Sequence, residues 1–276
     1  LFFDYPVVDI HPDILGLICM LNFFPFIGSR VEFPLAVSPR LEKAFKRAPF
    51  TNKKEIDFTN VDDSIPKYKG SKMSIAFGGG VDSSAVRVMF PEAFLVHEAH
   101  IRDGELLHFH SHDVVQKLGE DKAALITTNQ RYVSNPGGWH SWPCSMVTSL
   151  LVATDKDIGL ILCGSVMGSN YLWNGAKYYD RHASRDVQGF SGNYWQSVFH
   201  DIGIPLFSPI DGISEYGSMS ISLGLIEANE VVYCMAKNGG SCDKCTKCFR
   251  REVLRSFVQS DFKPNWRNYD TAMIHD

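Results

Sequence analysis

The residues with the clearest chemistry form a short run of glycines followed by carboxylate and hydroxyl side chains. An apolar segment, residues 73–77, precedes this run and predicts a buried strand, and residues 85–90 after it can continue as a helix. Glycines at such a turn let backbone N–H groups and the positive end of the helix dipole face an anion closely. An aspartate or serine in the first turn can cap the helix, or hold a phosphate or a metal. The sequence therefore predicts a phosphate-binding loop made of Gly78, Gly79, Gly80, Val81, Asp82, Ser83 and Ser84.

The spacing of this run excludes two common phosphate loops and resembles a third. It lacks the Gly-Lys-Ser/Thr of a Walker A loop and the dinucleotide pattern Gly-x-Gly-x-x-Gly. It resembles the Ser-Gly-Gly-x-Asp-Ser PP-loop of the ATP pyrophosphatases. The matching residues are Gly79, Gly80, Asp82 and Ser83, and Gly78 stands where that family has serine. The resemblance implies that the loop binds the β and γ phosphates of ATP, with Asp82 and Ser83 as catalytic residues. A flexible turn with an N-cap serine is the alternative.

Four cysteines near the C-terminus form a second pattern, Cys-x7-Cys-x2-Cys-x2-Cys. They are Cys234, Cys242, Cys245 and Cys248. Two residues between cysteines allow both thiolates to reach one tetrahedral ion, and four thiolates close a structural zinc site. Basic residues surround the array and would offset its charge; these are Lys244, Lys247, Arg250 and Arg251. Disulfides or a redox Cys-x-x-Cys pair are the alternatives, but three cysteines at this spacing do not pair naturally.

Taken together, the loop and the cysteine array resemble the 7-cyano-7-deazaguanine synthase branch of the PP-loop enzymes. Residues 160–165 resemble the later strand and glycine turn of that branch, residues 205–210 its Pro-Ile-x-Thr-Pro-Leu segment, and residues 248–251 its Cys-x-x-Arg ending. The resemblance implies an open parallel sheet of the PP-loop (adenine nucleotide α-hydrolase-like) type. It also implies that Gly164 and Ser165 lie beside the nucleotide.

The chain departs from this branch in two places. The family's substrate segment, Tyr-Pro-Asp-Cys-Arg, is replaced by residues 167–175, which argues for an altered substrate. The N-terminal extension, residues 1–65, is also additional. It looks similar to the extensions of distant relatives, including a peptidoglycan-precursor glutamate epimerase that adenylates the carboxylate of a terminal glutamate.

Composition fits one α/β domain with an appendage. The 276 residues are 45% hydrophobic and 21% charged, with a formal net charge of −4. No broad polyanion-binding surface is implied, so a nucleic-acid partner is not expected. The apolar residues 14–28 are too few for a membrane span and are interrupted by Asn22 and Pro25, which predicts a buried helix and no membrane partner. Free cysteines and a zinc site indicate a reducing cytoplasm, and a homodimer is left open.

Periodic segments divide the chain into a small N-terminal module, an ATP-binding domain and a zinc-binding segment with a tail, over residues 1–65, 70–230 and 231–276. Helices are expected over 14–23 and 39–47 of the first part, and residues 48–70 are expected to form a linker or an exposed hairpin. The second part alternates strands and helices, as an open parallel sheet requires. Its expected strands are 73–77, 93–97, 123–127 and 159–163, and its expected helices are 82–90, 112–119, 146–153, 194–201 and 223–228.

The carboxyl ends of parallel strands meet at one crevice, so residues 78–84, 97–102 and 164–170 are expected to gather there. In the PP-loop family the equivalent strand end lies against adenine, which implies that His97, Glu98 and His100 are placed to touch the nucleotide. Ordinary strand-end polar residues are the alternative. The histidines between 97 and 112 are expected in surface loops, in preference to a second metal site.

Two further groups of residues are candidates for binding. An aromatic loop, residues 131–142, would overhang the crevice. Arg131 and His140 are its candidates for substrate contact and Trp139 for a stacking wall; a packed aromatic loop is the alternative. One of Asp211, Ser214 and Glu215 can help to hold Mg²⁺, which prefers oxygen ligands.

The function expected from these patterns is the adenylation of a small-molecule carboxylate. ATP and Mg²⁺ are the expected cofactors beside structural zinc, and pyrophosphate is the leaving group. A nitrogen nucleophile would then give a ligase like 7-cyano-7-deazaguanine synthase, whereas removal of the α-proton would give an epimerase of a UDP-muramoyl-alanyl-glutamate precursor. A non-catalytic nucleotide-binding or partner-binding module is the alternative from another class, motivated by Gly78 and by the missing substrate segment.

Overall fold

The computed structural model describes most of the chain. The described residues are 1–7, 9–23, 26–47, 55–102, 105–106, 109–130, 145–167, 172–173, 176–177, 194–231 and 245–264. All statements below concern these residues.

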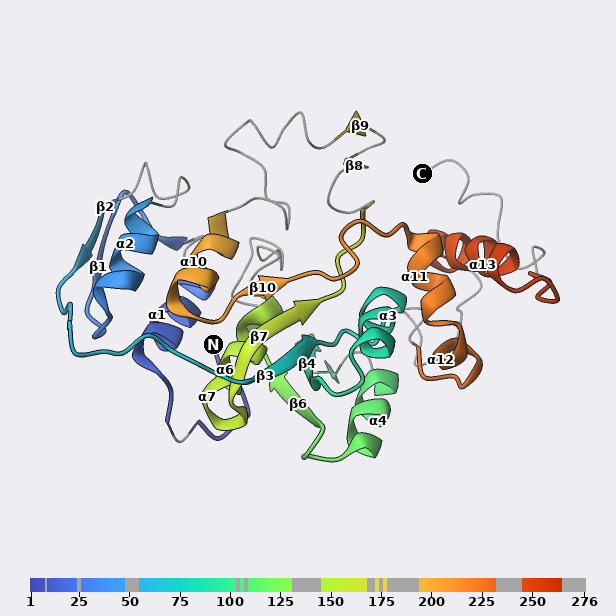
Figure 1. Ribbon diagram of the computed structural model, residues 1–276, viewed down its shortest axis with the longest axis horizontal. Helices are drawn as coiled ribbons and strands as arrows, with labels where there is room; N and C mark the ends of the chain where they lie inside the picture. Colours follow the sequence, from blue (N-terminus) through green and yellow to red (C-terminus); the bar gives the residue numbers. More distant parts are fainter. Residues whose placement is uncertain are drawn as a thin grey trace.

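A parallel sheet of five strands forms the centre of the molecule (Figure 1). In spatial order the strands are β10 (Leu206–Phe207), β7 (Ile158–Cys163), β3 (Lys72–Ala76), β4 (Phe94–Arg102) and β6 (Ala123–Thr128). The first strand of this sheet in the sequence is β3, which lies in its middle. The next two, β4 and β6, lie on one side of β3, and β7 and β10 lie on the other side. The short β5 (Glu105–Leu106) pairs antiparallel with the end of β4. The predicted open parallel sheet is therefore confirmed.

Alternating side chains of the strands supply two separate cores, one on each face of the sheet. On β4, Leu95 belongs to one hydrophobic cluster, whereas Phe94 and Val96 belong to the other. On β7, Leu162 faces the first cluster and Ile161 the second. Strands that are apolar on both sides are typical of parallel sheets with helices on both faces.

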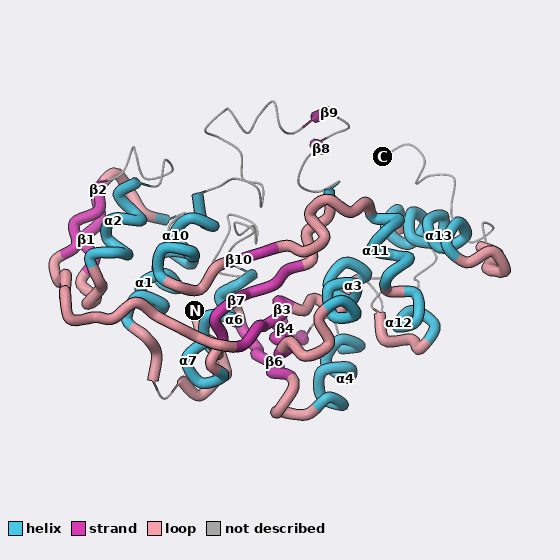
Figure 2. The backbone as a smooth tube through the Cα atoms, in the orientation of Figure 1, coloured by secondary structure: helices cyan, strands magenta, loops and turns pink. Residues whose placement is uncertain are grey.

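The helices complete a three-layer arrangement. On one face lie α3 (Val81–Met89) and α4 (Phe109–Leu118). On the other face lie α1 (Pro12–Phe23), α2 (Pro39–Arg47), α6 (Val147–Leu151), α7 (Ala153–Lys156) and α10 (Tyr194–Ile202). Figure 2 shows the sheet passing between the two groups. The expected helices over 14–23, 39–47, 82–90 and 194–201 agree with α1, α2, α3 and α10 to within two residues at each end.

The N-terminal residues join the main core. Leu17 and Leu21 of α1 share one cluster with Phe94 and Val96 of the sheet. A buried carboxylate ties this region together, because Asp13 accepts hydrogen bonds from Ser38 N at 2.7 Å and Ser38 Oγ at 2.6 Å. Since Ser38 immediately precedes α2, the start of that helix is fixed against α1.

The prediction of a linker or exposed hairpin over residues 48–70 is wrong in part. Residues Glu55–Phe58 form β2, which pairs in parallel with β1 (Arg30–Phe33). Parallel strands cannot be joined by a hairpin and need a crossover. Here α2 lies between β1 and β2 in the sequence and supplies that crossover.

The C-terminal part adds three helices that cover the far side of α3 (Figures 1 and 2). They are α11 (Glu215–Ile221), α12 (Leu223–Glu227) and α13 (Thr246–Val258). A third apolar cluster joins them to the start of α3 through Val81, Met219 and Ile226. The sequence predicted α12 but not α13. Because α11 packs against both α3 and α13, it holds α13 close to the glycine loop.

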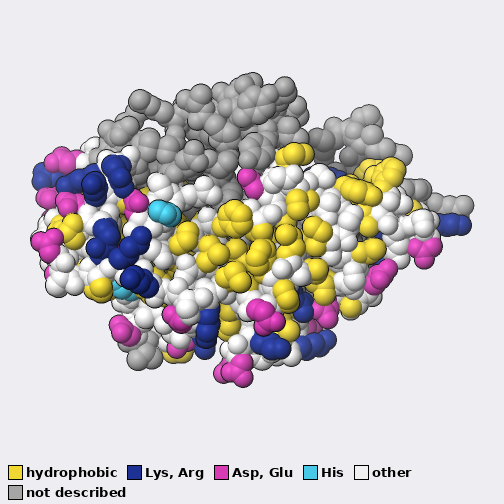
Figure 3. All heavy atoms as spheres, viewed as in Figure 1, with side chains coloured by type: hydrophobic (Ala, Val, Ile, Leu, Met, Phe, Trp, Pro, Cys, Tyr) yellow, Lys and Arg dark blue, Asp and Glu magenta, His cyan; other side chains and the backbone are white. Residues whose placement is uncertain are grey.

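Side chains on the surface are unevenly distributed (Figure 3). Hydrophobic side chains gather across the middle of the face shown there, and many of its lysines and arginines lie at the end that carries α2. That helix contains Arg40, Lys43, Lys46 and Arg47. None of the described helices is both long and apolar enough to cross a membrane.

Candidate functional site

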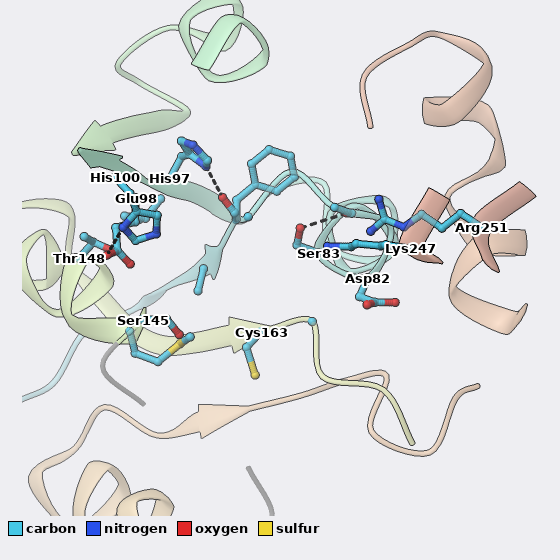
Figure 4. Close-up of a pocket in the computed structure, with 17 residues that line it drawn as sticks. Asp82, Ser83, His97, Glu98, His100, Ser145, Thr148, Cys163, Lys247 and Arg251 are labelled. Carbon is cyan, nitrogen blue, oxygen red and sulfur yellow. Dashed lines mark hydrogen bonds and ion pairs between the residues drawn. The ribbon is translucent and has the colours of Figure 1, made fainter. Parts of the chain in front are cut away.

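A cavity of about 310 Å³ lies at the carboxyl ends of β3, β4 and β7. The strand order reverses between β3 and β7, and ligands of open α/β sheets bind at such a switch point. We call this the switch-point cavity. Figure 4 shows the residues that line it, drawn from β3, β4, β7, the start of α3, the region of α6, and α13. Of the three segments expected at the crevice, each contributes lining residues, including Gly78, His97 and Gly164.

The glycine loop has the geometry expected of a phosphate cradle. Gly79 has φ +72°, a left-handed conformation that favours glycine. Gly80 is the N-cap of α3 and, as a glycine, has no side chain with which to cap the helix. The first turn of α3 and the positive end of its dipole lie at the cavity, which Gly80, Asp82 and Ser83 line.

Gly164 is required by a close approach of two backbones. A Cβ atom at this position would lie 2.6 Å from Ser83 N and 2.7 Å from the carbonyl carbon of Asp82. The end of β7 thus rests directly on the first turn of α3. By contrast, a Cβ at Gly78 would meet no atom within 4 Å. The loop therefore has room for the serine that PP-loop enzymes carry at the position of Gly78.

Asp82 and Ser83 line the cavity, whereas Val81 and Ser84 are buried beneath the loop. Asp82 Oδ1 accepts a hydrogen bond of 2.7 Å from Ser218 Oγ of α11, which fixes the orientation of the carboxylate. Ser83 Oγ donates to Gly80 O at 3.2 Å. Of the loop residues expected to bind phosphate, Gly78, Gly80, Asp82 and Ser83 line the cavity.

Two cations of α13 complete the wall beside the glycine loop. Lys247 and Arg251 line the cavity, and Figure 4 shows both side chains reaching toward the start of α3. Arg251 is only 9% exposed, and its Nη2 lies 3.5 Å from the position that a Cβ on Gly80 would occupy. The sequence indicates both cations only as neighbours of the cysteines. Their four-residue spacing puts them on one helix face, but it does not specify what that face contacts.

The wall formed by β4 carries a buried acidic and basic pair. Glu98 and His100 alternate with His97 along the strand and line the cavity. His100 Nδ1 lies 3.1 Å from Glu98 Oε1, and the two side chains are 6% and 8% exposed, respectively. Figure 4 shows this pair beside Thr148, on the opposite side of the glycine loop from Lys247 and Arg251.

His97 supports the loop from beneath. Its Nδ1 lies 2.6 Å from Phe77 O, and because a carbonyl can only accept, Nδ1 carries the hydrogen. The His97 ring also packs edge-on against His112 of α4, with 5.2 Å between the ring centroids.

The expectation of surface histidines is wrong for three residues. His97, His100 and His112 are all buried, because β4 continues to Arg102 and α4 already begins at Phe109. His108 lies outside the described residues.

Two residues at the end of β7 fill structural roles beside the cavity. Burial raises the pKa of the Cys163 thiol well above its ordinary value, so this cavity-lining sulfur stays neutral. Ser165, expected beside the nucleotide, is buried and does not line the cavity. Its carbonyl oxygen accepts a 2.7 Å hydrogen bond from Ser208 Oγ, which joins the end of β7 to the end of β10.

The three candidate magnesium ligands after β10 do not line the cavity. Ser214 is the N-cap of α11 and accepts from Gly217 N, while Glu215 forms an ion pair of 3.2 Å with Arg250. Among the residues that line the cavity, Asp82 and Glu98 carry carboxylates.

Only half of the predicted zinc site can be described. Cys234 and Cys242 lie outside the described residues. Cys245 is the N-cap of α13, and its Sγ accepts a hydrogen bond of 3.4 Å from Cys248 N, while Cys248 is buried. This brings both sulfurs to the start of one helix, where the dipole favours negative charge. Among the described residues no three metal-ligating side chains converge.

The predicted substrate contacts Arg131, Trp139 and His140 also lie outside the described residues. Ser145 and Met146, which follow that loop, line the cavity beside Glu98 and His100. The three contacts therefore stay predictions.

A model for a family of unknown function, DUF6395, matches residues 194–271. The matched part includes α10, β10, α11, α12 and α13, and therefore Ser218, Lys247 and Arg251. Neither a curated protein nor a solved structure matches the chain.

Proposed function

We propose that the switch-point cavity binds Mg-ATP and that the protein adenylates a carboxylate, with pyrophosphate as the leaving group. The observation that carries this proposal is the position of Arg251, whose buried guanidinium lies against the glycine loop at the N-terminus of α3. A guanidinium, an ammonium and a helix N-terminus at one cavity favour an anionic ligand there. A polyphosphate has the charge and the oxygen atoms to satisfy all three.

The proposed contacts divide the triphosphate between the loop and α13. The backbone from Gly78 to Ser83 surrounds the β and γ phosphates, and the Ser83 hydroxyl lies within the same first turn. Lys247 and Arg251 contact the same phosphates from the side of α13. Since both cations sit on the β,γ side, they stabilise the charge that develops on pyrophosphate as it leaves.

Magnesium fits the carboxylate side of this arrangement. Asp82 lines the cavity with a carboxylate held by Ser218, and Mg²⁺ binds proteins through one or two carboxylates together with phosphate oxygens. When bound, the ion would offset the charge of the phosphates. The residues of the chain contribute mainly orientation, because a substrate held in line with the α phosphate needs no covalent help from the protein.

The four cysteines are proposed to hold a structural zinc ion that fixes the start of α13. Cys245 and Cys248 fit this role, since the helix begins at one sulfur and buries the other. Lys247 lies between them in the sequence, so the ion would also fix the phosphate-binding end of the helix. A metal analysis of the purified protein that finds no zinc would contradict this part of the proposal.

Release of pyrophosphate from Mg-ATP across a panel of carboxylates tests the proposal. The panel includes 7-carboxy-7-deazaguanine with ammonium and UDP-muramoyl-alanyl-glutamate, and Asp82→Ala is the inactive variant. We expect substrate-dependent release that falls at least about 100-fold in Asp82→Ala, because the carboxylate that Ser218 holds in the cavity would contact the metal.

The same assay separates the alternatives. Release with the deazaguanine acid and ammonium indicates the ligase, and release with the muramoyl peptide indicates the epimerase. ATP that binds without pyrophosphate release under any member of the panel would favour the non-catalytic module.

A further inference from the structure

Glu98 and His100 form a second functional feature of the cavity, on the side away from the phosphate-binding cations (Figure 4). Even-numbered residues of β4 face α6, so Val96, Glu98 and His100 follow one another along a single wall. Phe77 N donates to Val96 O at 2.8 Å, so the glycine loop leaves β3 directly beside Glu98. The wall with Glu98 and His100 and the wall with Lys247 and Arg251 belong to one cavity of about 310 Å³, so a single ligand can contact both.

Burying this pair does not favour stability. Burying an ionised carboxylate costs several kcal/mol, and one contact with an imidazole seldom repays that cost. Apolar residues fill the neighbouring positions on the same wall, where Val96 and Met146 are buried. A buried carboxyl group beside an imidazole in the wall of a cavity is thus better explained by chemistry than by packing.

The chemistry that this pair can perform is proton transfer. A carboxylate 3.1 Å from an imidazole nitrogen stabilises the imidazolium that forms when the ring accepts a proton. The side chains that line the cavity from the region of α6 and from β7 are Ser145, Met146, Thr148 and Cys163. None of them competes as a base, because the Cys163 thiol is held neutral by burial.

We propose that His100, whose Nδ1 lies 3.1 Å from Glu98 Oε1, is the general base of the step that follows adenylation, an inference that rests on the proposed function. Adenylation itself needs no proton to be removed, whereas both possible second steps remove one from nitrogen or from carbon. In a ligase, the nitrogen nucleophile forms the new C–N bond, AMP leaves with the electrons of the acyl C–O bond, and His100 takes the proton from nitrogen. In an epimerase, the α C–H bond breaks, its electrons move toward the acyl carbonyl, and His100 takes that proton. A proton from solvent then adds to the opposite face of the α carbon, and hydrolysis of the acyl-adenylate releases AMP and the epimerised acid.

The two half-reactions can be measured separately in His100→Ala, His100→Gln and Glu98→Gln. The acid of the panel that supports pyrophosphate release is used with Mg-ATP, and hydroxylamine traps the acyl-adenylate as a hydroxamate without a protein base. We expect hydroxamate formation within about threefold of the unmodified protein and a loss of the complete reaction of about 100-fold or more. Added imidazole should restore the complete reaction in His100→Ala. His200→Ala, which removes an exposed histidine, is the control. It should lose neither hydroxamate formation nor the complete reaction.

Each other outcome would overturn the inference. Equal loss of hydroxamate and of product would assign the pair to binding or folding, and full turnover in His100→Ala would exclude the base. No pyrophosphate release by the unmodified protein with any acid would remove the proposed function and this inference with it.

Discussion

Replacing Arg251 with glutamine is expected to weaken the binding of Mg-ATP by about 10- to 100-fold. The guanidinium is buried against the glycine loop, and hydrogen bonds to charged groups contribute about 1.5 to 3 kcal/mol. Isothermal titration with Mg-ATP measures the effect. Because one positive charge is lost from a charged surface, the comparison needs a variant with the same change in net charge.

Arg250→Gln supplies that control from the adjacent position of α13. The Arg250 side chain is 60% exposed and pairs with Glu215, so its loss should change the affinity for ATP by less than about threefold. Equal effects of the two substitutions would mean that Arg251 acts only through the general charge of the helix.

Replacing Gly164 with alanine is expected to damage both the loop and the fold. The new Cβ would lie 2.6 Å from Ser83 N, and backbone atoms cannot move aside as a flexible side chain can. Overpacking of this kind costs about 1 to 3 kcal/mol, so we expect a lower urea midpoint and at least about a tenfold loss of ATP affinity.

Gly78 is the matched position, because it lies in the same cavity but has open space around its Cα. Gly78→Ala should leave the urea midpoint unchanged or slightly higher, since the unfolded chain loses conformational freedom. Gly78→Ser, which adds the hydroxyl of the PP-loop motif, should bind ATP no more weakly than the natural sequence. Strong destabilisation by either substitution would show that the space around the Cα of Gly78 is not open.

Local sequence patterns predicted the central domain well, for a physical reason. The runs 73–77, 123–127 and 159–163 are short and apolar, which in a parallel sheet means burial on both faces. The structure has strands at Lys72–Ala76, Ala123–Thr128 and Ile158–Cys163. Order along the chain also predicted the meeting of Gly78, His97 and Gly164, because the carboxyl ends of parallel strands share one edge.

The features that the sequence did not predict, the pairing of β1 with β2 and the contact of α13 with the glycine loop, depend on long-range packing. The pairing of Glu55–Phe58 with Arg30–Phe33 joins segments separated by a helix, and neither segment carries a strong apolar run. Lys247 and Arg251 reach the glycine loop only because α11 holds α13 against α3. No pattern within α13 specifies a contact with a loop that precedes it by more than 160 residues.

The relative affinities for Mg-ATP, Mg-AMP and Mg-pyrophosphate, measured by isothermal titration, test the central claim most directly. If the β and γ phosphates lie between the glycine loop and α13, ATP should bind at least about tenfold more tightly than AMP, and pyrophosphate should compete with ATP. Equal binding of ATP and AMP, no competition by pyrophosphate, or no nucleotide binding at all would contradict the account.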